Sequence, residues 1–243
     1  MHNIDIYDDK QALVEAAAAL FVEQASATQG NFTVALAGGS TPLPVYELLA
    51  TDTYASQVDW NKVHIFFGDE RAVPKTHQDS NYGATQTAFL AHVPIPLENV
   101  HRMKGELPAE EAAKDYGLML KDFFDGGPPA FDLHYLGMGG DGHTLSLFPG
   151  VTDALNESEH RVIATGDNKH THQRITLTAW AANASKTIVV LVSGEGKAEK
   201  LREVLEGEYT PERNPIQLIK PAPGQLLWMV DQGAASKLAD DAD

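Results

Sequence analysis

The stretch FDLHYLGMGGDGHTLSLFPG, residues 131–150, decides how the rest of the sequence is interpreted. Its apolar residues 133–136 predict a buried strand, and the glycines that follow allow the backbone to bend sharply beside a ligand. The turn places Asp141 two residues before His143. Ligands of open α/β sheets bind outside the carboxyl ends of strands, so we expect a binding or active site at this turn.

The same letters match the dinucleotide fingerprint G-x-G-x-x-G at Gly137, Gly139 and Gly142. That fingerprint should open a helix, and an acid ending a second strand should follow about 20 residues later. Here a Pro-Gly pair ends any helix soon after the turn, and the acids near that distance lie in the polar stretch TDALNESEH. We therefore expect neither NAD nor FAD at this site.

Strands and helices alternate along the chain. Helices are predicted at residues 9–28, 42–49, 80–90, 109–124 and 179–184 and after 196, and strands at 32–37, 63–67, 133–136, 174–177, 187–192 and 226–230. This order predicts an α/β fold with a doubly wound, mostly parallel, Rossmann-like sheet and helices on both faces. No internal repeat or linker interrupts it, so we expect one domain over residues 1–243.

The composition of the chain excludes several classes of binding partner and of chemistry. The net charge of −16 over 243 residues argues against nucleic acid and anionic membranes, which require a basic surface. The absence of cysteine excludes disulfides, thiolate nucleophiles and cysteine metal ligands. There is no apolar run near 18 residues and no signal-like N-terminus, so we expect a soluble, cytoplasmic protein. An anionic substrate would need locally placed cations.

A second glycine turn, AGGSTP at residues 37–42, joins a predicted strand to a predicted helix. Ser40 or Thr41 is expected at the helix N-cap, and the amides from Gly38 and Gly39 onward could bind a phosphate. It is not a Walker A loop, because no G-K-[ST] follows. A plain tight turn with a good cap is the alternative interpretation.

A third turn, GDER at residues 68–71, also follows an apolar strand. Arg71 could pair with an anion, and Asp69 could bind hydroxyls or orient a catalytic group. Each could instead form a surface ion pair or a helix cap. If the sheet is parallel, the three turns should meet at one edge.

Further cations and histidines lie near predicted element ends. Arg174 opens a strand and Lys197 follows the SGEG segment, although either could be a solvated charge. His160, His170 and His172 suggest a metal site, but no third ligand stands at a recognised spacing, so we interpret this region as a polar surface loop without a metal.

Taken in order, six blocks of this sequence resemble the 6-phosphogluconolactonase family. They are LAGGSTPLPVYELL, FFGDERAVP with HQDSNYGAT, FDLHYLGMGGDGHTLSLFPG, QRITLT, VLVSGEGKAEKL and PAPGQLLWMVDQGA. The resemblance implies a fold shared with glucosamine-6-phosphate deaminases and a cofactor-free esterase acting on a phosphorylated sugar lactone in the pentose phosphate pathway. The chain departs from the family pattern at NKHTHQ, residues 168–173, where a more proline-rich loop is usual.

The resemblance also assigns roles to residues. It implies that His143 is the general base, with Asp141 as its neighbour. It implies that the phosphate binds the glycine turn and nearby cations, namely Gly39, Ser40, Thr41, Arg71, Arg174 and Lys197. The role assigned to His143 also fits the reaction. Opening a lactone needs an activated water, and a histidine side chain can accept the proton of that water near neutral pH.

Two other interpretations remain open. A glucosamine-6-phosphate deaminase/isomerase would share the D-G-H turn, but that family places an acid five residues after the histidine, where this chain has Phe148, and reads D-E-Y where this chain has D-E-R. A catalytically silent sugar-phosphate-binding module is the other alternative. No oligomeric state is predicted.

Overall fold

The computed structural model describes residues 3–166 and 171–239. Its strands are β1 (Asn3–Tyr7), β2 (Phe32–Leu36), β3 (Val63–Phe67), β4 (Asp69–Arg71), β5 (Leu133–Gly137), β6 (Val162–Thr165), β7 (Arg174–Leu177), β8 (Thr187–Val192) and β9 (Gln225–Asp231). Its α-helices are α1 (Lys10–Ala27), α2 (Leu43–Leu49), α3 (Asp52–Ala55), α4 (Asn81–Thr85), α5 (Ala109–Phe123), α6 (Thr152–Leu155), α7 (Ala179–Ala182), α8 (Ala198–Glu206) and α9 (Gln232–Ala235). Short helical turns are η1 (Trp60–Lys62), η2 (Gln86–Leu90), η3 (Leu97–Asn99), η4 (Glu195–Lys197) and η5 (Pro215–Leu218).

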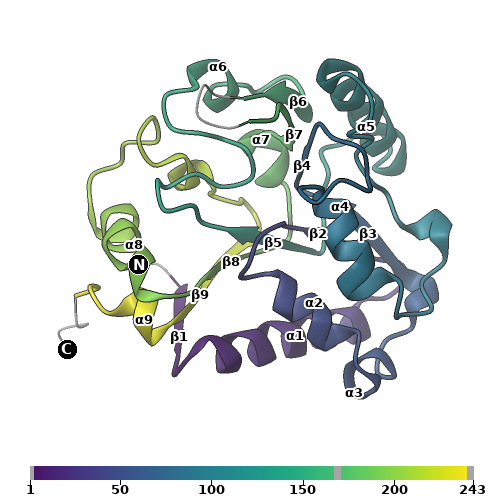
Figure 1. Ribbon diagram of the computed structural model, residues 1–243, viewed down its shortest axis with the longest axis horizontal. Helices are drawn as coiled ribbons and strands as arrows, with labels where there is room; N and C mark the ends of the chain where they lie inside the picture. Colours follow the sequence, from purple (N-terminus) through teal and green to yellow (C-terminus); the bar gives the residue numbers. More distant parts are fainter. Residues whose placement is uncertain (1–2, 167–170, 240–243) are drawn as a thin grey trace.

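A six-stranded sheet forms the centre of the fold, in the order β1-β9-β8-β5-β2-β3 (Figure 1). Every pairing in it is parallel. The inner strands are runs of buried residues, as in FTVAL of β2, because a parallel sheet is covered on both faces. The predicted α/β fold is confirmed.

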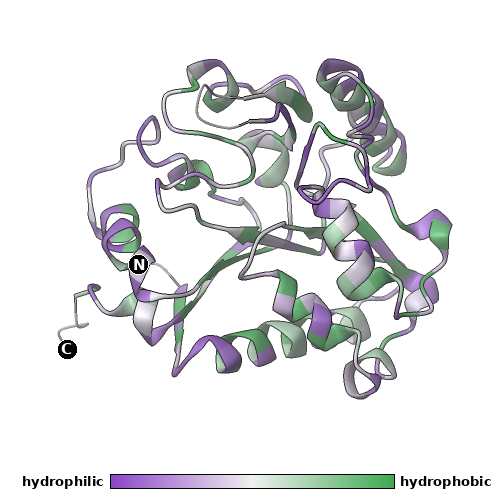
Figure 2. Cartoon of the chain, viewed as in Figure 1, coloured by the Kyte–Doolittle hydropathy of each residue, from purple (hydrophilic) through white to green (hydrophobic). Residues whose placement is uncertain are grey.

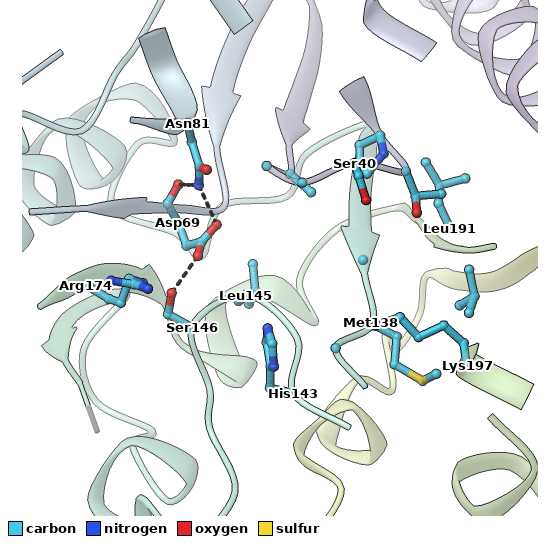
Figure 3. A pocket seen from close by; sticks show the side chains of 18 of the residues that line it. Ser40, Asp69, Asn81, Met138, His143, Leu145, Ser146, Arg174, Leu191 and Lys197 are labelled. Atoms are coloured by element: carbon cyan, nitrogen blue, oxygen red, sulfur yellow. Dashed lines mark hydrogen bonds between the residues drawn. The ribbon is translucent and has the colours of Figure 1, made fainter. Parts of the chain in front are cut away.

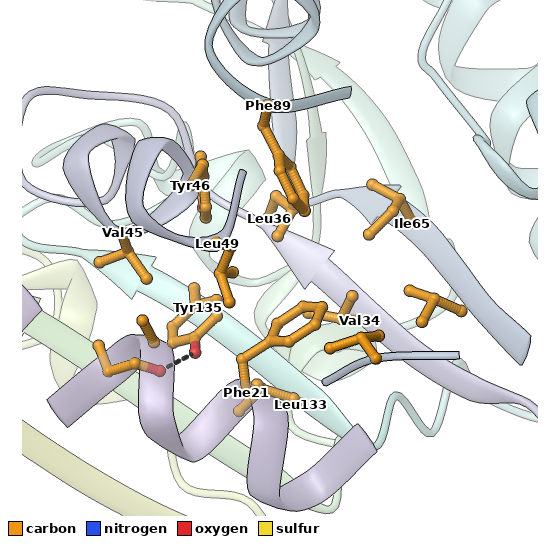
Figure 4. Packing of buried hydrophobic residues seen from close by; sticks show 14 of the residues in the cluster. Phe21, Val34, Leu36, Val45, Tyr46, Leu49, Ile65, Phe89, Leu133 and Tyr135 are labelled. Atoms are coloured by element: carbon orange, nitrogen blue, oxygen red, sulfur yellow. Dashed lines mark hydrogen bonds between the residues drawn. The ribbon is translucent and has the colours of Figure 1, made fainter. Parts of the chain in front are cut away.

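Helices cover both faces of this sheet. On one face α1 and α2 pack on β2, β3 and β5 through an apolar cluster that includes Phe21, Tyr46 and Phe89 (Figure 4). The Tyr135 hydroxyl, at the end of a buried side chain, donates to the Ala17 carbonyl of α1 at 2.7 Å and so satisfies both polar groups. On the other face, α5 covers Phe66, and α8 covers β8 and β9.

Hydropathy follows this layering. Figure 2 shows apolar residues gathered on the central strands and polar residues on the outer surfaces of the helices. Among the described residues, no helix has the length and apolar character needed to cross a membrane.

A second, three-stranded antiparallel sheet with the order β4-β7-β6 was not expected from the sequence. Residues 174–177 were predicted as a strand, but β7 belongs to this smaller sheet, and the predicted turn after β3 contains its short edge strand β4, residues 69–71. The small sheet packs with α5 over Phe66 of the central sheet. It therefore fixes the segment that follows β3.

The prediction that Ser40 or Thr41 caps α2 is wrong. The N-cap is Pro42, and no side chain caps this helix. The two residues instead form part of the turn between β2 and α2, so their polar atoms are not committed to the helix. In contrast, Asp9 caps α1 by accepting from the Ala12 amide at 2.9 Å.

Candidate active site

A cavity of about 290 Å³ opens at the carboxyl ends of β2, β3, β5 and β8. The chain order reverses between β2 and β5, since β3 lies on one side of β2 and later strands are added on the other. Such a switch point is where open α/β sheets bind ligands, because the loops on either side diverge. The three predicted turns meet here: the cavity is lined by Gly39, Asp69 and His143, among others.

His143 and Asp141 form an acid–histidine pair on the turn after β5. The Asp141 Oδ1 atom lies 2.6 Å from His143 Nδ1 and also accepts from the His143 amide at 3.2 Å. The hydrogen bond to His143 holds the pKa of Asp141 well below its usual range. A permanently charged acceptor at Nδ1 favours the tautomer with the proton on Nδ1 and the lone pair on Nε2. This is the tautomer that a general base needs on the cavity side.

Hydrogen bonds between its own residues fix the shape of the turn after β5. The Gly139 amide donates to the His143 carbonyl at 2.8 Å, and Thr144 Oγ1 donates to the Gly137 carbonyl at 2.9 Å. A Cβ at Gly139 would overlap the His143 ring, so a residue without a side chain is required there. Phe148 packs beside the imidazole with ring centroids 5.2 Å apart. The histidine is therefore held from two sides.

Asp69, on the turn after β3, has different partners. Its Oδ2 accepts from Ser146 Oγ at 2.5 Å and its Oδ1 from Asn81 Nδ2 at 3.1 Å, as Figure 3 shows. Asn81 also lies so close to Gly38 that a Cβ there would collide with its carboxamide. Asp69 thus connects three segments of the cavity wall: its own, the start of α4 at Asn81 and the segment at Ser146.

The neighbouring Glu70 is a buried structural acceptor. Its carboxylate accepts from the amides of Arg71, Asn81 and Tyr82 and from the Ser80 hydroxyl, at 2.7–3.0 Å. Burial raises the pKa of Glu70, and these four donors oppose that rise. The carboxylate ties β4 to the start of α4 and thereby places Asp69 and Asn81.

Arg71 and Arg174 lie directly opposite each other on the neighbouring antiparallel strands β4 and β7. Arg71 Nη1 donates to the Asp79 carbonyl at 2.6 Å, and Arg174 Nη1 donates to the His172 carbonyl at 2.5 Å. Arg174 is 7% exposed and lies over the Phe148 ring at 6.0 Å. Both line the cavity and give this wall positive charge.

The opposite end of the cavity holds the second glycine turn and Lys197. Gly38, Gly39, Ser40 and Thr41 line it, and Figure 3 places Ser40 and Lys197 on the side away from Arg174. Burial lowers the pKa of Lys197, while the charge of Asp141 opposes that effect. A cation and a turn rich in amides at one end can bind an anion.

All predicted site residues line the cavity except Asp141, which lies behind His143. Sequence reasoning missed Asn81, Ser146 and Phe148 as wall residues. Each stands inside a quoted motif, in HQDSNYGAT or GHTLSLFPG, but nothing in local spacing shows which member of a motif faces a ligand. Their contacts join residues up to 77 positions apart.

Two of the three histidines near residue 170, His160 and His172, are described, and each has its own acidic partner. His160 pairs with Glu157 at 3.2 Å, on the surface. His172 lies 3.1 Å from Asp79. His170 lies outside the described residues.

Comparison with known proteins decides the family. Residues 8–228 match the family model described as glucosamine-6-phosphate isomerases/6-phosphogluconolactonase. The chain belongs to this family. It is similar to a 6-phosphogluconolactonase of Synechocystis, with 40% identity over 97% of this chain and 98% of that protein, and to the human 6-phosphogluconolactonase, with 38% identity over 97% and 93%.

Solved structures agree with the sequence comparison. The 6-phosphogluconolactonase structure from Thermotoga maritima superposes with a TM-score of 0.81 at 30% identity, covering 95% of this chain and all of that one. The family name covers isomerases as well as lactonases. The relatives named above, which match over nearly their whole length, are lactonases.

Proposed function

We propose that this protein hydrolyses 6-phospho-D-glucono-1,5-lactone to 6-phospho-D-gluconate, a step of the pentose phosphate pathway. The observation that carries the proposal is the Asp141–His143 pair, 2.6 Å apart, in a cavity bordered by three cationic side chains. The similarity to proteins named 6-phosphogluconolactonase supports it.

In the proposed reaction, His143 Nε2 takes a proton from water as the water oxygen attacks the lactone carbonyl. Asp141 keeps the proton on Nδ1 and stabilises the imidazolium that forms. The tetrahedral intermediate then collapses, the bond to the ring oxygen breaks, and His143 returns the proton to that oxygen. The step needs no covalent intermediate and no cofactor.

Charge on the substrate determines the expected orientation. We place the phosphate against the amides of Gly39, Ser40 and Thr41 with Lys197 beside them, and the two arginines supply the remaining positive charge. The oxyanion would be stabilised by glycine amides of the two turns, with Arg71 as a weaker candidate. Asp69, held by Ser146 and Asn81, is placed to bind sugar hydroxyls.

One observation argues against the deaminase alternative. In that family an acid stands five residues after the histidine and assists ring opening, whereas here Phe148 packs on the His143 ring. An apolar ring can exclude water from one side of the imidazole but cannot transfer a proton. The site therefore favours hydrolysis.

The test is hydrolysis of freshly prepared 6-phosphoglucono-1,5-lactone, followed by NADP reduction through 6-phosphogluconate dehydrogenase, with the spontaneous rate subtracted. We expect acceleration with this lactone and no release of ammonia from glucosamine 6-phosphate. Ammonia release without lactone turnover would replace the proposal by the deaminase function, and binding of 6-phosphogluconate with no turnover of either substrate would indicate a silent binding module.

We further propose that residues 1–243 work as one domain and that the protein acts in the cytoplasm. Fractionation of the native host tests the location, and limited proteolysis tests the domain.

A further inference from the structure

Three potential metal ligands converge beside the arginine wall of the cavity. The Asp79 Oδ2 atom lies 3.1 Å from His172 Nε2 and 3.7 Å from His77 Nδ1. The two imidazole rings meet edge to face with centroids 5.3 Å apart. One ligand atom from each of the three residues can be chosen so that all lie within 4.8 Å of one another.

The donor set is that of a transition-metal site. Two imidazoles and a carboxylate suit Zn²⁺, which binds nitrogen at about 2.0–2.1 Å and carboxylate oxygen at about 2.0–2.2 Å. Ligands of one tetrahedral ion therefore lie about 3.3 Å apart, close to the two distances to Asp79. A fourth position would remain for water.

The three side chains can adjust and are accessible to an ion. They are 38% exposed for His77, 44% for Asp79 and 26% for His172. The Asp79 amide currently donates to His77 Nδ1 at 3.1 Å, and a metal at that nitrogen would replace this hydrogen bond. Drawing His77 toward the others is therefore the main rearrangement that binding requires.

The cluster is joined to the cavity through its own backbone. Arg71 donates to the carbonyl of Asp79, and Arg174 donates to the carbonyl of His172. An ion bound by the side chains of these two residues would link the segments that anchor both arginines. The positive charge of the arginines opposes a nearby cation, and the Asp79 carboxylate offsets part of that repulsion.

The sequence around His172 also differs from the family pattern. His172 belongs to NKHTHQ, which stands where the resemblance to the 6-phosphogluconolactonase family leads one to expect a more proline-rich loop. The residue that completes the cluster thus lies in the segment where this chain departs from the family pattern.

We propose that His77, Asp79 and His172 form a binding site for a transition-metal dication of the Zn²⁺ type, and that the bound ion fixes the two backbone segments that hold Arg71 and Arg174. The ion has a positioning role outside the reaction and contacts no reacting atom. The proposal departs from the interpretation of the His172 region as a polar surface loop without a metal, and the experiment below decides between the two.

Calorimetric titration of the untagged protein with ZnCl₂ near neutral pH tests the site without any substrate. We expect one equivalent of Zn²⁺ to bind. His172→Gln and His77→Gln should each weaken that binding at least as much as loss of a group behind a ligand does, about 10–100-fold, because each removes a ligand itself. His92→Gln is the matched control, because His92 is an exposed histidine outside the proposed ligand set whose Nε2 lies 3.0 Å from the Thr87 carbonyl.

Hydrogen exchange supplies the second readout. Zn²⁺ should slow amide exchange in residues 77–80 and 171–174 of the wild type and leave His172→Gln unchanged. Equal Zn²⁺ affinity in wild type and His172→Gln, or an equal loss in His92→Gln, would overturn the proposal. Because neither readout uses the lactone, a failure here is distinct from a failure of the proposed hydrolase function.

Discussion

The turns after β3 and β5 both leave buried parallel strands at the same edge of the sheet, yet they use their carboxylates in different ways. After β5, Asp141 has a histidine ring as its partner and is not among the residues that line the cavity. After β3, Glu70 is buried among four donors and Asp69 is bound by Ser146 and Asn81. In the proposed function the first arrangement prepares a base for proton transfer, whereas the second positions cavity walls.

The largest effect is expected from His143→Ala, which removes the proposed base and leaves the carboxylates of Asp69 and Glu70 in place. Turnover of the lactone should fall by about 10²–10⁴-fold, the usual contribution of a general base, while the melting temperature stays near that of the wild type. Steady-state kinetics with the spontaneous rate subtracted measures it. Turnover within twofold of the wild type would remove His143 from this role.

Asp141→Asn tests the partner of the base. The amide can donate to Nδ1 as well as accept from it, so the useful tautomer is no longer enforced and the imidazolium loses its counter-charge. We expect kcat to fall roughly tenfold or more with little change in KM, because Asp141 does not line the cavity. A change confined to KM would instead indicate that Asp141 contacts the substrate.

Glu70→Gln changes the buried carboxylate of the turn after β3. We expect it to lower the free energy of unfolding more than it lowers turnover. The amide nitrogen would meet at least one of the backbone amides that the carboxylate now accepts from. Leaving a buried donor unsatisfied costs about 1–3 kcal/mol of unfolding free energy, which urea denaturation measures. Wild-type stability together with lost turnover would mean that this turn, too, carries chemistry.

The smallest effect at neutral pH is expected from His134→Leu, on the strand just before the Asp141–His143 turn. Burial lowers the pKa of His134 to about 3, so the folded protein keeps this ring neutral while the unfolded chain takes up a proton as pH falls below about 6.5. Stability is therefore lost as the pH falls from about 6.5 toward 3, by up to about 1.4 kcal/mol per pH unit for one group.

His134→Leu should make that loss shallower by up to this slope. The Ser185 hydroxyl, which contacts the ring, keeps its bond to the Ala182 carbonyl. Urea denaturation of both proteins between pH 6 and pH 4 gives the comparison, and parallel pH profiles would contradict the assignment of a neutral buried ring.

Local pattern predicted much of this fold. The strands 63–67, 174–177 and 187–192 were predicted with the bounds of β3, β7 and β8. β3 and β8 are mostly apolar runs, and RITL of β7 alternates polar and apolar residues; both patterns are typical of strands. The small sheet was missed because β4 is a three-residue polar segment whose strand character comes from pairing with residues about 100 positions away. Such pairing leaves no local pattern.

The same distinction between local patterns and contacts of distant segments applies to the site. His143, Asp69 and the glycine turn could be predicted because each directly follows an apolar strand in the sequence. The Ser40 or Thr41 cap was wrong because the turn between β2 and α2 is longer than the minimal one assumed. Ser146, Asn81 and the His77–Asp79–His172 cluster depend on contacts between distant segments, which only the structure shows.

In the proposed reaction His143 and Asp141 act as one unit on water. A double-variant cycle measures this most directly, using kcat for lactone hydrolysis in wild type, His143→Ala, Asp141→Asn and the combined variant. If Asp141 acts only through the imidazole, the combined variant will be no slower than His143→Ala alone. Losses that multiply in the combined variant would show that Asp141 contributes independently of His143 and would contradict the account.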